Sequence, residues 1–264
     1  MKNFAIIGVA GYIAPRHLKA IKDTKNNLVA ALDPSDNVGV LDNFFPETAF
    51  FTEFERFDRH IYKLLNSQSD EKIDYLSICS PNYLHDSHIR YALRMNAHCI
   101  CEKPLTLRPW NIDGLSSVSQ STDKKVFTIL QLRLHERVIA LKKEVEDQLK
   151  SDPTHIFDVE LTYITSRGNW YYASWKGDEE KSGGIATNIG VHFFDMLHWI
   201  FGPVQHQKVH VRSHDRASGV LSFKNANVRW FLSINAATLP ETVVQNGGRI
   251  HRSLRFDQWS FDFT

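Results

Sequence analysis

The sequence predicts two domains, an α/β domain with a doubly wound parallel sheet followed by an α+β domain with a large open, mainly antiparallel sheet. The chain has 264 residues, and single hydrophobic cores stop growing at about 250 to 300 residues, which favours two cores. Short apolar strands alternate with amphipathic helices in the first half, whereas longer β-like runs dominate after Pro153. We place the domains at residues 1–125 and 126–264.

Composition excludes several classes of protein. Hydrophobic residues make up 42% of the chain and charged residues 23%, which is typical of a soluble globular fold. The formal charge is +1, so the basic excess that nucleic-acid binding needs is missing. The apolar stretch that follows Met1 is too short for a signal peptide, and no window approaches the roughly 18 apolar residues of a membrane span. We expect a cytoplasmic protein that binds neither nucleic acid nor a membrane.

In the first half, the rhythm of strand and helix is regular. We expect six strands, at residues 4–8, 27–32, 49–51, 73–79, 97–101 and 126–130. Helices should cover residues 14–21, 54–65, 85–95 and 136–150. Cys79, Cys99 and Cys101 all fall in these strands, and their odd number and spacing predict reduced core thiols. Cys99 and Cys101 could suggest a metal pair, but no neighbouring cluster completes a site, so no metal is expected.

The second half has the pattern of one open sheet. Expected strands cover residues 157–165, 204–213, 219–223, 228–235 and 249–256. One clear helix, residues 190–201, ends at Gly202-Pro203. Such a sheet can have one face covered by helices while the other is left free for a partner or substrate.

The turn after the first strand carries a nucleotide-binding pattern. Residues 8–14 read Gly-x-x-Gly-x-x-Ala, a weakened dinucleotide fingerprint whose helix N-terminus would face a pyrophosphate. Asp33 ends the next strand, where an acid about 20 residues further on reads the ribose hydroxyls and repels a 2′-phosphate. The pattern predicts NAD rather than NADP, although Asp33 would also suit an ordinary turn before Pro34.

Two later motifs emerge where strands end, at the sheet edge on which doubly wound folds bind ligands. Ser80-Pro81-Asn82 and His85 follow one strand, and Glu102-Lys103-Pro104 follows the next. Asn82 could cap the following helix, contact a cofactor, or do both.

An ordered set of motifs across nearly the whole chain resembles the glucose-fructose oxidoreductase/inositol dehydrogenase/MocA family. The set comprises the glycine turn, Ser80-Pro81-Asn82, Glu102-Lys103-Pro104, Trp175-Lys176-Gly177-Asp178, and Gly183-Gly184 leading to Asn188-x-Gly190-x-His192. Within the family, residues 1–8, 11–17 and 162–171 resemble the WlbA/WbpB-type UDP-N-acetyl-2-amino-2-deoxyglucuronate 3-dehydrogenases.

That resemblance implies a function. It implies NAD-dependent oxidation of the 3-hydroxyl of UDP-N-acetylglucosaminuronic acid to a 3-keto sugar, in the biosynthesis of bacterial surface polysaccharide such as lipopolysaccharide O-antigen. It also implies a homo-dimer or homo-tetramer formed through the exposed sheet face. Because relatives continue beyond the position of Thr264, we expect the family's last segment to be missing from this chain.

The resemblance also assigns roles to residues. Oxidation of an alcohol needs a base near neutral pKa and a charge that favours an alkoxide-like oxygen. His192 is expected as the base and Lys103 as its electrostatic partner, although the two could exchange roles. The residues expected to bind the cofactor are Gly8, Ala10, Gly11, Tyr12, Ile13, Asp33, Ser80, Pro81, Asn82, His85, Glu102, Lys103, Gln131, Trp175 and Lys176. Those expected to bind substrate are Lys103, Arg167, Asn169, Tyr172, Thr187, Asn188 and His192.

Other interpretations stay open. Many family members carry Asp where Asn188 stands, so this side chain can bond a sugar hydroxyl but cannot act as an acid or base. His192, Asp195 and His198 are spaced like metal ligands, but the sixth residue along a helix turns away from the first. The chain could instead be another sugar or polyol dehydrogenase of the family, or a non-catalytic NAD-binding sensor. The sequence does not tell whether NADH leaves after each cycle or is reoxidised in place by a keto acid.

Overall fold

The computed structural model describes residues 1–68, 70–257 and 259–262. The chain divides into two compact units, Met1–Ile129 and Leu130–Thr264. The division falls after the strand Val126–Thr128, which pairs with the first unit's sheet, rather than at the expected boundary between residues 125 and 126.

The first unit contains a six-stranded sheet in the order β3-β2-β1-β4-β5-β6, in which every pairing is parallel. Its strands are β1 (Asn3–Ile7), β2 (Asn27–Leu32), β3 (Ala49–Phe51), β4 (Tyr75–Ile78), β5 (His98–Cys101) and β6 (Val126–Thr128). Its helices are α1 (Ala14–Asp23), α2 (Val40–Phe44), α3 (Phe54–Asn66), η1 (Asn82–Leu84), α4 (His85–Arg94) and α5 (Trp110–Thr122). The strand order reverses between β1 and β4, where such sheets bind ligands.

Two apolar clusters hold this sheet between its helices. One joins the sheet to α3, α4 and α5 through residues such as Phe57, Ile89 and Leu115, and the other joins it to α1 through Leu18 and Ile21. Because helices cover both faces, the strands are mostly apolar, and β2 is buried from Leu28 to Leu32. The expected doubly wound α/β fold is confirmed.

The second unit contains a six-stranded sheet in the order β12-β11-β7-β10-β9-β8. Its strands are β7 (Phe157–Thr165), β8 (His206–Arg212), β9 (Arg216–Ser222), β10 (Ala226–Ser233), β11 (Ile250–Phe256) and β12 (Trp259–Asp262). Only the central pairing, β7 with β10, is parallel. The helices are η2 (Gln131–Leu134), α6 (Glu136–Ser151), α7 (Asn169–Ala173), α8 (Glu179–Ser182), η3 (Ala186–Gly190), α9 (Val191–Phe201), η4 (Ala236–Thr238) and α10 (Glu241–Gln245).

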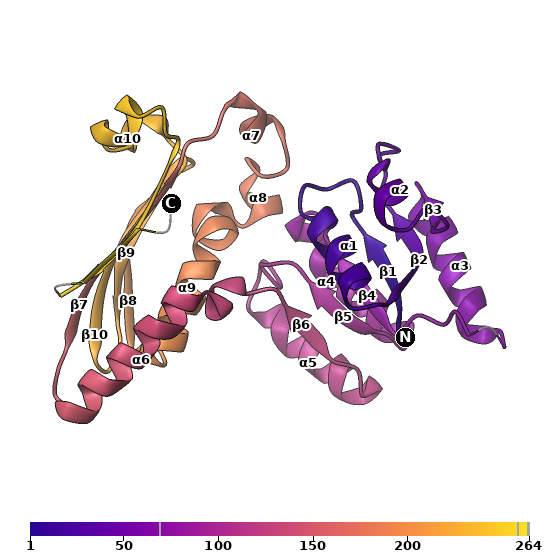
Figure 1. Cartoon of the computed structure of the whole chain (residues 1–264), viewed down its shortest axis with the longest axis horizontal. Helices are drawn as coiled ribbons and strands as arrows, with labels where there is room; N and C mark the ends of the chain where they lie inside the picture. The colour runs from indigo at the N-terminus through magenta and orange to yellow at the C-terminus, as the bar shows by residue number, and fades with distance from the viewer. Residues whose placement is uncertain (69, 258, 263–264) are drawn as a thin grey trace. The chain divides into compact units, whose positions relative to one another are not determined.

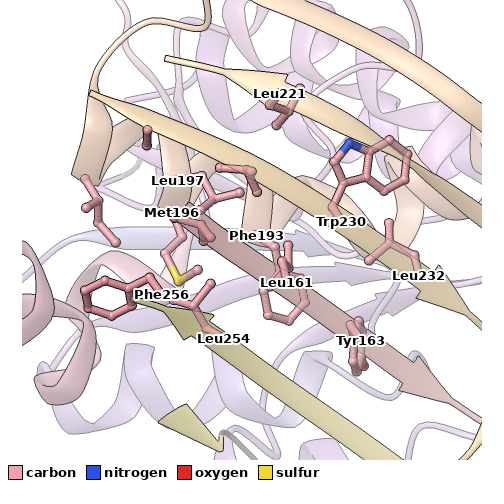
Figure 2. Close-up of a cluster of buried hydrophobic side chains, with 14 of the residues drawn as sticks. Leu161, Tyr163, Phe193, Met196, Leu197, Leu221, Trp230, Leu232, Leu254 and Phe256 are labelled. Carbon is pink, nitrogen blue, oxygen red and sulfur yellow. The ribbon is translucent and has the colours of Figure 1, made fainter. Parts of the chain in front are cut away.

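Figure 1 shows α6 and α9 on the same face of this second sheet. Figure 2 shows how Phe193, Met196 and Leu197 of α9 meet the inward side chains of the strands, among them Leu161 and Trp230. Outward residues of the same strands alternate with these and pair with one another on the exposed face. The guanidinium of Arg229 contacts the carboxylates of Asp158 and Glu160 at 2.8 Å and 3.1 Å. The expected mainly antiparallel sheet, with one face covered by helices, is confirmed.

Candidate active site

The glycine turn in the first unit has the geometry of a nucleotide site. Gly8 has a φ of +87°, and a Cβ there would lie 2.6 Å from the backbone of Cys79 and Ser80, so only glycine fits between β1 and β4. Helix α1 begins directly after the turn, with Ile13 at its N-cap and no side chain bonded to its first amides. A pocket of about 660 Å³ opens beside this helix end. It is lined by Val9, Ala10, Gly11, Tyr12, Pro15, Arg16, Asn37, Gly39 and Val40.

Asp33 connects this turn to the loop after β2. One carboxylate oxygen accepts a hydrogen bond from the backbone N–H of Ala10 at 3.0 Å, and the other accepts from the N–H of Ser35 at 2.9 Å. The side chain is therefore more than a turn residue before Pro34, because it fixes the glycine turn to the end of β2. Each carboxylate oxygen has a second lone pair with which to accept from a ribose hydroxyl.

Two histidines contact the segment Glu102-Lys103-Pro104 at the end of β5. The Nε2 of His17, on α1, lies 3.0 Å from a carboxylate oxygen of Glu102, and its Nδ1 lies 2.6 Å from the hydroxyl oxygen of Ser77 on β4. Although burial raises the pKa of Glu102, the hydrogen bond and charge of His17 and the charge of Lys103 lower it below its ordinary value. The carboxylate is thus ionised beside the Lys103 ammonium.

His85, the first residue of α4, lies on the other side of the same segment. Its side chain is fully buried, with Nδ1 at 2.7 Å from the backbone oxygen of Pro104 and Nε2 at 2.9 Å from that of Ser80. Because both nitrogens face backbone carbonyls and none of the ring is exposed, the structure gives His85 a supporting position instead of the expected cofactor contact. Asn82 lies in η1 and is also buried, and the N-cap of α4 is Leu84, so the capping role of Asn82 stays a prediction.

His88 completes this group beneath the sheet edge. Its Nδ1 lies 2.9 Å from the hydroxyl oxygen of Ser80, and its ring stacks on Phe54 at 5.8 Å between centroids. Burial, with a smaller effect from the nearby His85, lowers the pKa of His88 from 6.5 to about 4.

The buried His88 makes the first unit sensitive to acid. Between pH 6.5 and 4 the unfolded chain binds a proton at this position that the folded chain does not, so stability falls as the pH is lowered. We expect about 2 kcal/mol of the free energy of unfolding to be lost at pH 5 relative to neutral pH through this group. Protection factors of the β4 amides at the two pH values measure the loss, and His88→Asn should reduce it. An equal loss in both proteins would contradict the assignment.

The second unit presents its polar side chains around the start of α9. A π-helical turn, η3, precedes α9, and such turns are frequent at functional sites because they widen the spacing of side chains. Asn188 lies in this turn, and its Nδ2 donates to the hydroxyl oxygen of Tyr171 at 3.2 Å. His192 follows in the first turn of α9 and is half-buried. The backbone therefore places Asn188 and His192 one turn apart.

An ion pair fixes α9 from its other side. The guanidinium of Arg133, in η2, bonds both carboxylate oxygens of Asp195 at 2.8 Å and 2.5 Å. Asp195 is therefore held by arginine and is not a metal ligand with His192 and His198. Across the described ranges, no group of three or more His, Cys, Asp or Glu side chains could hold a metal ion. The three cysteines are free thiols.

Positive charge gathers on the segments that flank α7. Lys176 places its ammonium 4.2 Å from the centre of the Trp175 ring, and the exposed Arg167 guanidinium lies over Trp170 at 5.9 Å. Burial lowers the pKa of Lys176, and the charge of Arg167 lowers it further. Two cations that repel each other in one region favour an anionic ligand, because an anion would relieve their repulsion.

The remaining expected residues fall in the same two regions. Ser80 and Pro81 lie between β4 and η1 in the first unit. In the second unit, Gln131 starts η2, Asn169 and Tyr172 lie exposed on α7, and Thr187 lies in η3. Sequence reasoning missed His17, Tyr171 and Arg133 as contributors. No local pattern could have found them, because their partners lie 85, 17 and 62 positions away along the chain.

Comparisons with known proteins identify the family. Residues 2–129 match the model described as the NAD-binding Rossmann fold of an oxidoreductase family, and residues 153–251 match that family's C-terminal alpha/beta domain. The chain belongs to the GFO/IDH/MocA family. As in other members, a nucleotide-binding unit comes first and a unit with an open sheet follows.

One solved structure of a GFO/IDH/MocA family member matches the whole length of this chain. The WlbA (WbpB) dehydrogenase from Thermus thermophilus is 48% identical with a TM-score of 0.94, and the match covers 100% of this chain and 83% of that one. It has been solved in complex with NAD and alpha-ketoglutarate, and with NAD and UDP-GlcNAcA.

Two curated enzymes are more distant. A D-glucoside 3-dehydrogenase from Escherichia coli is 22% identical over 66% of this chain and 56% of its own length. A glucose-6-phosphate 3-dehydrogenase from Bacillus subtilis is 24% identical over 76% of this chain and 54% of its own length. The chain thus spans only about half the length of these relatives. In the part of the chain that the structure describes, no helix is long and apolar enough to cross a membrane.

Proposed function

We propose that this protein oxidises the 3-hydroxyl of UDP-N-acetylglucosaminuronic acid to the 3-keto sugar with NAD, in the biosynthesis of bacterial surface polysaccharide such as lipopolysaccharide O-antigen. The observation that carries the proposal is the match over the full chain, at 49% identity and a TM-score of 0.94, to the Thermus thermophilus dehydrogenase solved with NAD and UDP-GlcNAcA. At that identity the likeness extends beyond the fold. We further propose that the protein is cytoplasmic and acts as a homo-dimer or homo-tetramer.

The residues present fit a dinucleotide. The turn at Gly8 approaches β4 so closely that a side chain is excluded, no side chain caps the start of α1, and a pocket of about 660 Å³ lies beside Arg16 and Asn37. Asp33 is placed to accept from the ribose hydroxyls. NAD would supply the acceptor for the hydrogen that leaves the sugar carbon.

His192 and Lys103 have different roles in the removal of the hydroxyl proton. Oxidation removes a proton from the sugar hydroxyl, and the oxygen passes through an alkoxide-like state. His192 takes the proton, and the Lys103 ammonium stabilises the developing negative charge. Asn188, whose Nδ2 donates to the hydroxyl oxygen of Tyr171, contributes an amide that can hydrogen-bond a sugar hydroxyl.

The substrate's negative charges match the second unit. A nucleotide sugar acid carries a carboxylate and a diphosphate, and Arg167, before α7, forms a region of positive charge with Lys176, after α7. Asn169, Tyr172 and Thr187 add polar side chains nearby in the chain. Neutral hexoses would lose the interaction with these cations.

A substrate panel tests the proposal. NADH absorbance should rise when UDP-N-acetylglucosaminuronic acid is added, and not with UDP-N-acetylglucosamine, glucose 6-phosphate or myo-inositol. Each assay is run with and without 2-oxoglutarate, because the Thermus relative was solved with that keto acid. If NADH remains bound, turnover appears only when the keto acid is present, and it is followed as 2-hydroxyglutarate because the keto acid reoxidises the NADH. No response to the sugar acid under either condition, although NAD binds, would favour a non-catalytic sensor.

Asp33 should determine the choice of cofactor. Asp33→Asn removes the charge that binds the ribose hydroxyls, and we expect the NADH dissociation constant to rise about tenfold, while the preference over NADPH shrinks because a 2′-phosphate is no longer repelled. Fluorescence titration with each cofactor measures both effects. Asp36→Asn, an exposed acid in the same loop, is the matched control. Unchanged discrimination in Asp33→Asn would place the ribose elsewhere.

A second candidate is a 3-dehydrogenase of a simpler sugar. The names of two curated relatives, the Escherichia coli D-glucoside 3-dehydrogenase and the Bacillus subtilis glucose-6-phosphate 3-dehydrogenase, indicate oxidation of a sugar at carbon 3. In the panel above, a response to glucose 6-phosphate or a glucoside that exceeds the response to the sugar acid would favour this candidate.

A further inference from the structure

Two histidines, the fully buried His85 and the largely buried His17, contact the segment Glu102-Lys103-Pro104 at its two ends. His17, on α1, reaches the Glu102 carboxylate, and His85, on α4, reaches the backbone oxygen of Pro104. Lys103 lies between Glu102 and Pro104, the two residues that the histidines contact. The side chain of His17 is 10% exposed and that of Glu102 is 13% exposed, so water has little access to the contact between them.

Each histidine also faces β4 or the loop that follows it. The second nitrogen of His17 faces the hydroxyl of Ser77, which is buried in the middle of β4. The second nitrogen of His85 faces the backbone oxygen of Ser80, just after that strand. The position of the lysine segment therefore depends on contacts with β4 and the loop after it, and not only on β5, the strand that the segment follows.

The proton arrangement of each ring is defined by its partners. A carboxylate only accepts, so the Nε2–H of His17 donates to Glu102, and its Nδ1 can accept from the Ser77 hydroxyl. Carbonyl oxygens also only accept, and burial lowers the pKa of His85, so at neutral pH this ring has one N–H for two carbonyls. The shorter contact, from Nδ1 to Pro104, is the one we assign to the N–H.

We propose that His17 and His85 are positioning residues that hold Lys103 in place for catalysis, through Glu102 and Pro104 respectively. An apolar residue could fill the space of either histidine. It could not bond Glu102 or Pro104, so it would not orient the segment. The proposal rests on the role given to Lys103 above. A mobile lysine would lose catalytic effect, since misplacement by about 1 Å can cost two orders of magnitude in rate.

Asparagine and glutamine separate positioning from simple packing. The amide nitrogen of asparagine occupies the place of Nδ1 of histidine, and that of glutamine occupies the place of Nε2. His85→Asn therefore keeps the bond to Pro104, whereas His85→Gln keeps only the contact with Ser80. At His17 the order is reversed, because Glu102 is bonded by Nε2 and Ser77 by Nδ1. His17→Gln thus keeps the segment and His17→Asn releases it.

The experiment compares the two pairs by kcat, KM and hydrogen exchange. We expect kcat of His85→Gln to lie about tenfold below that of His85→Asn, and kcat of His17→Asn about tenfold below that of His17→Gln, with KM for NAD changed little within each pair. Exchange of the amides in peptides that cover residues 102–106 should rise in the two variants that release the segment. Melting temperatures show whether all four variants are folded.

The outcomes distinguish the alternatives. Equal loss of activity within both pairs, with equal exchange, would overturn the proposal and leave the histidines as packing residues. Should the fully buried His85 variants fail to fold, the His17 pair decides alone. Should the wild-type protein fail to oxidise any sugar, the proposed function fails, yet the exchange difference still shows whether the histidines hold the segment.

Discussion

Replacing Lys103 with methionine should lower kcat about a thousandfold, because the ammonium that stabilises the alkoxide-like oxygen is lost. Methionine keeps the length and packing of the lysine stem, so the neighbouring contacts of Glu102 with His17 and of Pro104 with His85 remain. The NADH dissociation constant should stay within about threefold, since a transition-state interaction contributes to rate and not to cofactor binding. Steady-state kinetics and fluorescence titration measure the two effects.

The control for this variant is Lys125→Met, which removes an exposed lysine ahead of β6. It should leave both kcat and NADH binding as they are in the wild type. If Lys103→Met instead weakened NADH binding as much as it lowered kcat, Lys103 would be a cofactor ligand without a separate role in the chemistry.

Replacing His192 with alanine should lower kcat by about two to four orders of magnitude, because the general base is removed. The half-buried ring leaves a space at the start of α9, and added imidazole should restore part of the rate by taking the proton in its place. The rate is followed as NADH absorbance over a series of imidazole concentrations. NADH binding should remain close to that of the wild type.

His198→Ala provides the matched comparison, because His198 is exposed and lies on the same helix. Its activity should not change. A loss in His192→Ala that equals the loss in the control, or a complete absence of rescue together with a lowered melting temperature, would indicate that His192 supports α9 and does not take the proton.

The fold could be predicted largely from the sequence because local signals and tertiary packing agree. Strands at residues 27–32, 49–51 and 157–165 have the predicted bounds, since apolar runs or alternating residues end there at polar turns. Helices α2 and α5 carried a weaker signal. In α5 only Leu115 is buried and serines occupy much of the surface, so its apolar periodicity is faint. The short α7 and α8 were missed for a similar reason, because one turn shows no period.

Some residues of the candidate site could be predicted from the sequence, and others could not. Motif residues such as Gly8, Asp33 and Lys103 could be chosen from the sequence because they stand at strand ends, where the fold class itself predicts a ligand. The residues that support them could not. His17 meets Glu102 only because α1 packs beside β4 and β5, and Tyr171 meets Asn188 across 17 positions of the chain.

His85 shows the limit of motif reasoning most clearly. As part of Ser80-Pro81-Asn82-x-x-His85 it was expected to touch the cofactor, but the structure turns its ring into the core. A motif residue can thus act on the site through the backbone, in this case through the carbonyl of Pro104. Burial and hydrogen-bond partners, which the sequence does not contain, separate the two roles.

The most direct measurement follows the hydrogen that leaves the sugar. With UDP-N-acetylglucosaminuronic acid deuterated at carbon 3, mass spectrometry should find one deuterium on the reduced nicotinamide, or on 2-hydroxyglutarate if the cofactor is reoxidised in place by 2-oxoglutarate. Product analysis should show a 3-keto sugar that has lost the label. Reduced cofactor without deuterium, formed while the sugar retains its label, would contradict oxidation at carbon 3 and with it the proposed function.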